Sequence, residues 1–282
     1  MKKIIIIIFT CICLFIAYFL YISYYSLGVT TYEIKSSKIN EDINIIMIAD
    51  IHDQHCHIKD KVINKIKEFN PDLILCVGDI IDNQSENEKD TIQFLQSLTS
   101  ITDVYMSIGN HEIEYDESLG FIDEIENIGV HVLDQEYMDI KVHNNWIRIG
   151  GLYDYAFNTY DGKITQESMH NSVTYQFLNT MTKTSLFKIM MAHRPDSFIF
   201  GDAYQWDIDM ILSGHLHGGQ VVLPFFGGLY APDQGLFPKY DYGEYDLDQS
   251  KLMITRGVSS SGELLPRFNN LPEIVQIVLG RE

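Results

Sequence analysis

The chain opens with one long apolar stretch. Residues 4–25 carry no charge, and as a helix they would span about 33 Å at about 1.5 Å per residue, enough to cross the hydrocarbon core of a bilayer. Tyrosines gather at the far end, as in the aromatic belt of a membrane interface. The stretch is longer than a usual signal-peptide core and no small-x-small cleavage site follows it, which favours an uncleaved anchor over a cleaved signal peptide. A buried core helix is the third alternative, disfavoured because the stretch is apolar on all sides.

The flanking charges predict an orientation. Lys2 and Lys3 precede the apolar stretch, and Glu33 is the first charged residue after it. By the positive-inside rule the N-terminus lies in the cytoplasm and the body of the chain lies outside. We therefore expect a single-pass protein of the cell membrane with an anchor at 1–25, its main domain being extracytoplasmic.

The rest of the chain divides into a short polar segment and one domain. Residues 26–42 are rich in Ser, Thr and Lys, which is typical of a tether. Residues 43–282 then repeat one pattern, in which an apolar run of four to seven residues ends at a polar motif. The runs occupy residues 43–49, 73–77, 104–108, 188–192 and 209–213. Short continuous apolar runs of this kind are typical of strands buried on both faces.

Helical periodicity follows the first runs. Residues 58–69 and 87–98 have apolar positions at i, i+3, i+4 and i+7, so we expect helices that cover the strands. Alternation of strand and helix predicts a largely parallel sheet. By contrast, residues 141–152 and 243–258 have the pattern of hairpins, and residues 273–279 that of an alternating strand. No linker separates these parts, which favours one domain that contains a second, mixed sheet.

The net charge of the chain after residue 31 disfavours polyanionic partners. Residues 1–31 contain two bases and no acid, so the rest of the chain holds 18 bases against 39 acids, a formal charge of −21. Such a body repels polyanions, so we expect no nucleic-acid binding and little adhesion to anionic lipid surfaces. The 12% of aromatic residues excludes a disordered chain. Cys11 and Cys13 lie in the apolar stretch, which leaves two cysteines in the body and no disulfide framework.

The polar motifs at the ends of the runs carry the chemistry. In order they are Asp50-Ile51-His52, Gly78-Asp79, Gly109-Asn110-His111-Glu112, His193-Arg194-Pro195 and Gly214-His215-Leu216-His217. Ligands of open α/β sheets bind beyond the carboxyl ends of the strands, so we expect these side chains to meet at one mouth. Carboxylate and imidazole together suit Mn²⁺, Fe²⁺/³⁺ or Zn²⁺, and two such ions can clamp a transferring phosphoryl group. Two divalent ions would also give an acidic body one local cationic site for a phosphate ester.

In their order and spacing, these motifs resemble those of the calcineurin-like metallophosphoesterases over about residues 43–280. The C-terminal sequences around residues 214–220, 255–257 and 272–274 are similar to the membrane-anchored bacterial subgroup. The resemblance implies an α/β fold, a four-layer α/β/β/α sandwich of two mixed sheets, preceded by one N-terminal transmembrane helix. The catalytic domain would span residues 43–282.

The resemblance also implies roles for individual residues. One divalent ion would be held by Asp50, His52, Asp79 and His217, and a second by Asp79, Asn110, His193 and His215, with Asp79 as the bridge. His111 would act on the substrate as general acid or as a stabiliser of phosphoryl charge, so His111, Asp79 and Asn110 are the candidate catalytic residues. The implied cofactors are two divalent metal ions, with Mn, Fe and Zn left open.

The expected function is hydrolysis of a phosphodiester or pyrophosphate bond. The substrate would be a phosphate-ester small molecule or a lipid-linked or envelope compound, with a UDP-2,3-diacylglucosamine-type hydrolase as one candidate. Two alternatives stay open: a phosphomonoesterase such as a phosphoprotein phosphatase, and a non-catalytic metal-binding scaffold at the membrane.

Several other residues near the motifs have weaker signals. Structural positions are expected for His131, His143 and His170, and a polar loop for His55 and His57, with a substrate contact as the alternative. A core position is expected for Cys76, while Cys56 could be a soft metal ligand but has no second cysteine motif to support that role. Asp82 and Glu112 either orient a ligand histidine or cap a turn. Arg194 either meets a phosphate oxygen or lies on the surface.

Overall fold

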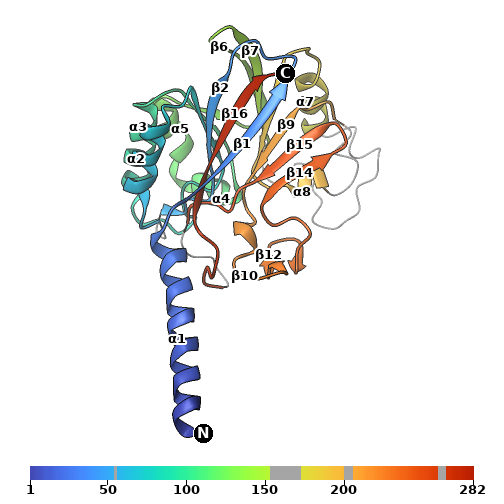
Figure 1. Cartoon of the computed structure of the whole chain (residues 1–282). Coiled ribbons are helices and arrows are strands. Elements are labelled where there is room, and N and C mark those ends of the chain that lie inside the picture. Colours follow the sequence, from blue (N-terminus) through green and yellow to red (C-terminus); the bar gives the residue numbers. More distant parts are fainter. Residues whose placement is uncertain (54–55, 153–172, 200–205, 260–264) are drawn as a thin grey trace.

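The computed structural model describes residues 1–53, 56–152, 173–199, 206–259 and 265–282. Its first element is the helix α1 (Lys2–Tyr25), which stands away from the rest of the molecule (Figure 1). By length and composition α1 could cross a membrane, with a mean hydropathy of 2.8 and none of its span buried against the domain. Its last turns do touch the domain, where Ser23 is buried. The expected N-terminal apolar helix is therefore present.

Two six-stranded mixed sheets follow. The first has the strand order β1 (Gly28–Ser36), β16 (Glu273–Arg281), β2 (Ile43–Ile48), β3 (Leu73–Val77), β4 (Val104–Ser107) and β5 (Val130–Leu133). In it β2, β3, β4 and β5 run parallel, β16 is antiparallel to β2, and β1 is parallel to β16. Since parallel strands end at the same edge, the motifs after β2, β3 and β4 lie together.

The second sheet supplies the other two motifs. Its strand order is β14 (Gly243–Leu247), β15 (Ser250–Ile254), β9 (Met210–Ser213), β8 (Phe187–Ala192), β7 (Asn145–Leu152) and β6 (Glu136–Val142). The inner four strands run parallel, and β14 and β6 close the two edges as antiparallel hairpins with their neighbours. Both hairpins agree with the sequence-based expectation.

Helices cover the outer faces and complete four layers. On the first sheet lie α2 (Lys59–Phe69), α3 (Glu88–Thr99), α4 (Asn110–Leu119) and α5 (Phe121–Asn127), and on the second lie α7 (Val173–Met181) and α8 (Asp196–Ile199). Between the sheets, Ile45 and Ile189 belong to one buried cluster. Val62 of α2 packs on the outside of the first sheet, and Leu178 and Phe198 pack on the outside of the second. The α/β/β/α sandwich of two mixed sheets is confirmed.

The segment expected to be a tether is mostly a strand. Within residues 26–42, Gly28–Ser36 form β1, which pairs along its whole length with β16. Its side chains alternate between half-buried and exposed, and Tyr32 and Ile34 pack against the central core. An edge strand with one solvated face needs few apolar residues, so its composition is that of a linker. Only two residues therefore separate α1 from the first sheet.

Short elements after β9 complete the fold near the site. The 3-10 helix η4 (His217–Gly219) leads into a hairpin of β10 (Val222–Leu223) and β11 (Gly227–Gly228). A second hairpin follows, formed by β12 (Tyr230–Ala231) and β13 (Gly235–Leu236). Both hairpins lie at the end of the domain from which α1 leaves (Figure 1).

Candidate metal centre

Sharp turns at the strand ends aim the predicted ligands inward. The residues with positive φ include five of them: Asp50, His52, Asp79, His215 and His217. A positive φ is unfavourable for residues with a side chain, and such strain clusters at functional sites. Glycines make room for the turns, since a Cβ at Gly78 would collide with the His193 ring and one at Gly109 would collide with Asp79. The backbone is thus shaped around these side chains.

Asp79 lies at the middle of the site. It is buried, and its Oδ2 lies 3.0 Å from His193 Nε2 and 3.7 Å from His52 Nε2. Its Oδ1 accepts a hydrogen bond from the backbone N–H of His111 at 2.9 Å. Asp79 therefore faces histidines that come from both sheets.

Asp50 is the second buried carboxylate. Its Oδ1 lies 3.7 Å from His217 Nε2, 3.9 Å from His52 Nε2 and 4.0 Å from His193 Nε2. The backbone N–H of His215 donates to both of its oxygens, at 3.0 and 3.1 Å. These bonds tie the turn after β9 to the turn after β2.

The ligand atoms form three overlapping groups. In each group, atoms able to bind one metal ion lie within 4.8 Å of one another. The groups are Asp50, His52 and His217; His52, Asp79 and His111; and Asp79, His193 and His215. The first group holds three of the four residues of one implied ion site, without Asp79, and the third holds three of the four residues of the other, without Asn110. The second group shares His52 with the first and Asp79 with the third, so the six predicted metal ligands in these groups lie close together. Asn110 is adjacent, at the first residue of α4, with its Oδ1 buried.

Electrostatics favour bound cations here. Burial raises the pKa of Asp50 to about 7, and Asp79 adds to the rise. Burial also opposes charge on Asp79, but His193, His52 and His111 hold its pKa well below the usual range. Burial likewise disfavours charge on His193, yet Asp79 and Asp50 raise its pKa to about 10. The site thus favours protons on Asp50 and His193 beside the charged Asp79, and divalent ions can replace these protons.

Burial favours the neutral form of two other ligand histidines, His215 and His217. Burial lowers the pKa of His215 to about 4 and that of His217 well below its ordinary value. Neutral imidazole is the form that binds metals. The buried atoms His217 Nδ1 and Asn110 Oδ1 make no hydrogen bond to any described residue. Together with the Asp, His and Asn donor set, these atoms fit a pair of divalent ions of the Mn, Fe or Zn type.

Neighbouring groups orient the ligands. His193 Nδ1 lies 2.8 Å from the backbone carbonyl of Val77, which can only accept, so Nδ1 carries the proton and Nε2 faces Asp79. Glu112 is buried and accepts hydrogen bonds from the backbone N–H groups of Gly109, Asp79 and Ile80. Of the two roles weighed for Glu112, the turn-holding one is therefore observed. It fixes the loops after β3 and β4 against each other.

Asp82 caps a turn, one of the two roles that the sequence left open, and it also lies near a ligand histidine. Its Oδ1 accepts the backbone N–H of Gln84 at 2.9 Å, as a turn cap does. Its Oδ2 lies 3.9 Å from His52 Nδ1, on the side of the ring away from Asp79.

His111 has a defined tautomer. The backbone N–H of Asn83 donates to His111 Nδ1 at 3.1 Å, so Nδ1 is the acceptor and the neutral ring carries its proton on Nε2. Its ring packs edge-on against that of His52, with centroids 4.3 Å apart. The Nε2–H is therefore the proton that His111 can offer to a substrate in this site.

Two polar positions were missed by the sequence analysis. Asp233, in the β12–β13 hairpin, lies 3.1 Å from His215 Nε2 and accepts from Arg194 Nη1 at 2.8 Å. Arg194 is buried and pairs with Asp233, so of the two alternatives considered for it the surface position is wrong, while a phosphate contact stays a prediction. Asn270 donates from Nδ2 to the backbone carbonyls of His217 at 2.7 Å and Gln220 at 3.1 Å. Neither residue follows an apolar run, so no sequence signal marked them.

Of the described residues, the other histidines and the two cysteines of the body belong to none of the three ligand groups. His131 stacks on Tyr105, and His143 pairs with Asp72 at 2.8 Å, as structural residues do. His57 stacks on Tyr24 of α1, while His55 and His170 lie outside the described residues. Cys56 is buried and burial raises its pKa to about 11, which disfavours the thiolate form that binds metals.

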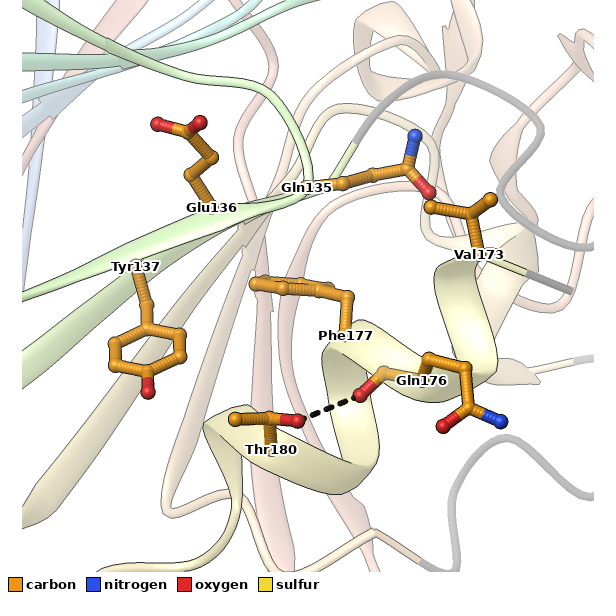
Figure 2. Close-up of a pocket in the computed structure, with 7 residues that line it drawn as sticks. All are labelled: Gln135, Glu136, Tyr137, Val173, Gln176, Phe177 and Thr180. Carbon is orange, nitrogen blue, oxygen red and sulfur yellow. Dashed lines mark hydrogen bonds between the residues drawn. The ribbon is translucent and has the colours of Figure 1, made fainter.

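A separate cavity of about 470 Å³ lies between β6 and α7 (Figure 2). It is lined by Gln135, Glu136, Tyr137, Val173, Gln176, Phe177 and Thr180. None of these is a residue of the metal centre, so the cavity contributes nothing to that site.

Known proteins share this sequence pattern. The calcineurin-like phosphoesterase family model matches residues 43–219. An uncharacterized metallophosphoesterase of Campylobacter jejuni is 28% identical, with 85% of this chain and 60% of the relative aligned. An uncharacterized metallophosphoesterase of Bacillus subtilis is also 28% identical, with 92% of this chain and 87% of the relative aligned. A transmembrane protein with metallophosphoesterase domain from Danio rerio is 24% identical, with 70% of this chain and 48% of the relative aligned.

The relatives differ in how much of their length is matched. The chain spans about 60% of the length of the Campylobacter relative and about half of the Danio one. The family model nevertheless covers more than half of this chain, including every motif from Asp50 to His217. The chain therefore belongs to the calcineurin-like phosphoesterase family.

Proposed function

We propose that this protein is a membrane-anchored, two-metal hydrolase that cleaves a phosphodiester or pyrophosphate bond of a lipid-linked or envelope substrate. The observation that carries the proposal is the position of Asp79 between two groups of ligands, with His193 Nε2 at 3.0 Å and His52 Nε2 at 3.7 Å from the same oxygen. A carboxylate placed in this way can bridge two ions, which is the arrangement that clamps a phosphoryl group.

Seven residues would hold the ions. One site takes Asp50, His52, Asp79 and His217, and the other takes Asp79, Asn110, His193 and His215. Bound divalent ions supply positive charge for the phosphoryl oxygens and acidify water at the site. They also neutralise the buried Asp50 and Asp79, so a body of formal charge −21 can bind an anionic ester at this one place.

His111 is the residue proposed to act on the leaving group. The backbone N–H of Asn83 donates to His111 Nδ1, and this hydrogen bond fixes the orientation of the ring and therefore the direction of its Nε2–H. From this position it donates a proton, or a charge-stabilising hydrogen bond, to the oxygen that leaves phosphorus. Asp79 fixes the same loop by accepting from the backbone N–H of His111.

The position of the proposed anchor α1 supports the proposal that the substrate is amphiphilic. α1 is long enough to span a bilayer, and its last turn contacts the loop that holds His217, through Ser23 and Asn270. A site joined this closely to a membrane helix suits a phosphoester that resides in or near the bilayer. With the positive-inside rule, the catalytic domain is placed on the extracytoplasmic face.

The full chain, purified in detergent and stripped with a chelator, tests the proposal. Mn²⁺ should restore hydrolysis of bis-nitrophenyl phosphate, with lower turnover of the monoester. Asp79→Ala and His217→Ala should abolish it, whereas His143→Ala, which removes a histidine outside the centre, should not. Preference for the monoester would favour the phosphatase alternative. Metal binding without turnover of either ester would favour a non-catalytic role.

A further inference from the structure

A cluster of exposed apolar side chains lies on the two hairpins after the metal centre. Phe225 is fully exposed, and Phe226, Leu236 and Phe237 are 73%, 68% and 56% exposed. We call these four residues the apolar tip. The hairpin segment 221–238 that carries them contains a single charged residue, Asp233, and that carboxylate is engaged by Arg194 and His215. The tip is therefore an uncharged patch on an otherwise strongly acidic protein.

The backbone keeps the tip exposed at a cost. Phe225 and Phe237 both have positive φ, 72° and 55°. This conformation is unfavourable for a bulky side chain and is ordinarily given to glycine or asparagine. Two aromatic residues held in it, both exposed to solvent, contribute nothing visible to the core. Strain combined with exposure of this kind indicates a surface that binds something apolar.

A ring contact and a backbone hydrogen bond join the apolar tip to the anchor. Phe19 of α1 packs against Phe268, with ring centroids 5.6 Å apart. Phe268 in turn accepts a hydrogen bond from the backbone N–H of Val222, the first residue of β10, at 3.0 Å. The turn at Phe225 is three residues beyond Val222. In Figure 1 both hairpins lie at the end of the domain from which α1 leaves.

The length of free helix places the bilayer at the same level. The residues of α1 before Phe19 are all exposed, and Phe19 is the first that is partly covered. The free part from Lys2 to Tyr18 is about 26 Å long at about 1.5 Å per residue, close to the thickness of a hydrocarbon core of about 30 Å. A bilayer spanned by this segment therefore reaches the domain near Phe19, at the level of the apolar tip.

We propose that the apolar tip is a second membrane contact, which inserts into the interfacial region of the same bilayer that α1 spans. Aromatic side chains favour this region, and the uncharged segment avoids the repulsion that the acidic body meets at anionic lipids. Since it rests on the proposed membrane anchoring, this inference deepens the proposed function. Two contacts instead of one fix the tilt of the domain, with η4 and its His217 held beside the lipid surface.

Tryptophan reporters in the full chain test the insertion. The protein is reconstituted into phosphatidylcholine vesicles with and without bromine on the acyl chains, and the emission added by Phe225→Trp is compared with the parent. We expect brominated lipid to remove about half or more of the added emission, with a blue shift on reconstitution. Met138→Trp, on the edge strand β6 and outside both hairpins, is the matched control and should show no such loss.

Ile8→Trp separates failure of this inference from failure of the proposed anchoring. This residue lies within the exposed part of α1, so its added emission should be strongly quenched. Quenching at position 8 without quenching at position 225 would overturn the second contact and leave the anchor standing. No quenching at either position would overturn both.

An activity assay of a double variant tests the membrane contact separately from the proposed hydrolase activity. The double variant Phe225→Asp and Phe226→Asp should hydrolyse soluble bis-nitrophenyl phosphate at the parental rate, because neither residue belongs to the metal centre. In vesicles we expect added protease to cut the domain of the double variant faster than that of the parent. If position 225 is not quenched and the parent, but not the double variant, is a dimer in detergent by light scattering, the tip binds a second copy and the proposal is wrong.

Discussion

Asn270 Nδ2 donates a hydrogen bond to the backbone carbonyl of His217 at 2.7 Å, while the backbone N–H of Asn270 donates to the hydroxyl of Ser23 in α1 at 3.2 Å. One residue therefore links a proposed metal ligand to the last turn of the helix. His217 has a positive φ, so its turn depends on such support.

Replacing Asn270 by Ala should weaken the metal centre without removing a ligand. The turn that carries His217 loses the bond to its carbonyl, and we expect affinity for Mn²⁺ to fall about tenfold, as is usual when a supporting contact of a ligand is lost. Calorimetric titration of the chelator-treated chain measures this. Asn144→Ala, in the exposed β6–β7 turn, is the control, and an unchanged affinity in Asn270→Ala would show that the bond is dispensable.

Loss of the proposed bridging carboxylate should lower the number of bound ions more than loss of a histidine that binds one ion. Asp79→Ala removes the proposed bridge and should leave less than one ion per chain, whereas His215→Ala should leave about one of two. Elemental analysis after equilibration with Mn²⁺ and desalting reads this directly. Equal metal content in the two variants would argue against a bridging role for Asp79.

His111 should matter for turnover more than for metal content. In His111→Gln we expect kcat to fall about 10²-fold or more with both ions retained, since the lost function is proton donation. The loss should be larger for an alkyl leaving group than for nitrophenolate, which leaves without a proton. An equal loss for both esters, or a loss of metal, would assign His111 a structural part instead.

Asp196 should make the stability of the metal-free protein depend on pH. Burial raises its pKa to about 7, and Asp233 adds to the rise. Because the unfolded value is about 3.9, the folded state binds more protons between the two values, and this contribution to stability falls as pH rises through that window. Asp196→Asn should remove the loss, which is at most about 4 kcal/mol at pH 8.

Unfolding of the chelator-treated parent and variant from pH 4 to 8 checks this. The gain of Asp196→Asn over the parent should be largest at pH 8 and vanish near pH 4. Asp248→Asn, in the exposed turn between β14 and β15, should parallel the parent at every pH. A gain that does not change with pH would mean that the carboxylate is not the cause.

Much of the fold and the centre was predictable from the sequence because the signals are local. Strands such as β3 and β8 are continuous apolar runs, and a polar motif at the end of a parallel strand must lie at the common edge. Asp50, Asp79, His193 and His215 follow such runs directly, and the structure brings them together.

What the sequence did not predict depends on contacts between distant segments. Asp233 reaches His215 across 18 residues, and Asn270 reaches His217 across 53, from loops without periodicity. β1 escaped detection because its solvated face dilutes the apolar pattern. Phe225 and Phe226 belong to an apolar run that has the composition of a core segment, so only their exposure in the fold sets them apart.

The two-residue connection between α1 and β1 limits how far the domain can move away from the end of α1. A flexible tether of 17 residues would have an r.m.s. reach of about 23 Å and would let the domain turn over freely. Two residues extend at most about 7 Å, and β1 is locked along β16. With α1 across a bilayer, as proposed, the metal centre would stay within a thin layer parallel to the membrane and would meet a membrane-bound substrate by lateral diffusion, a search in two dimensions.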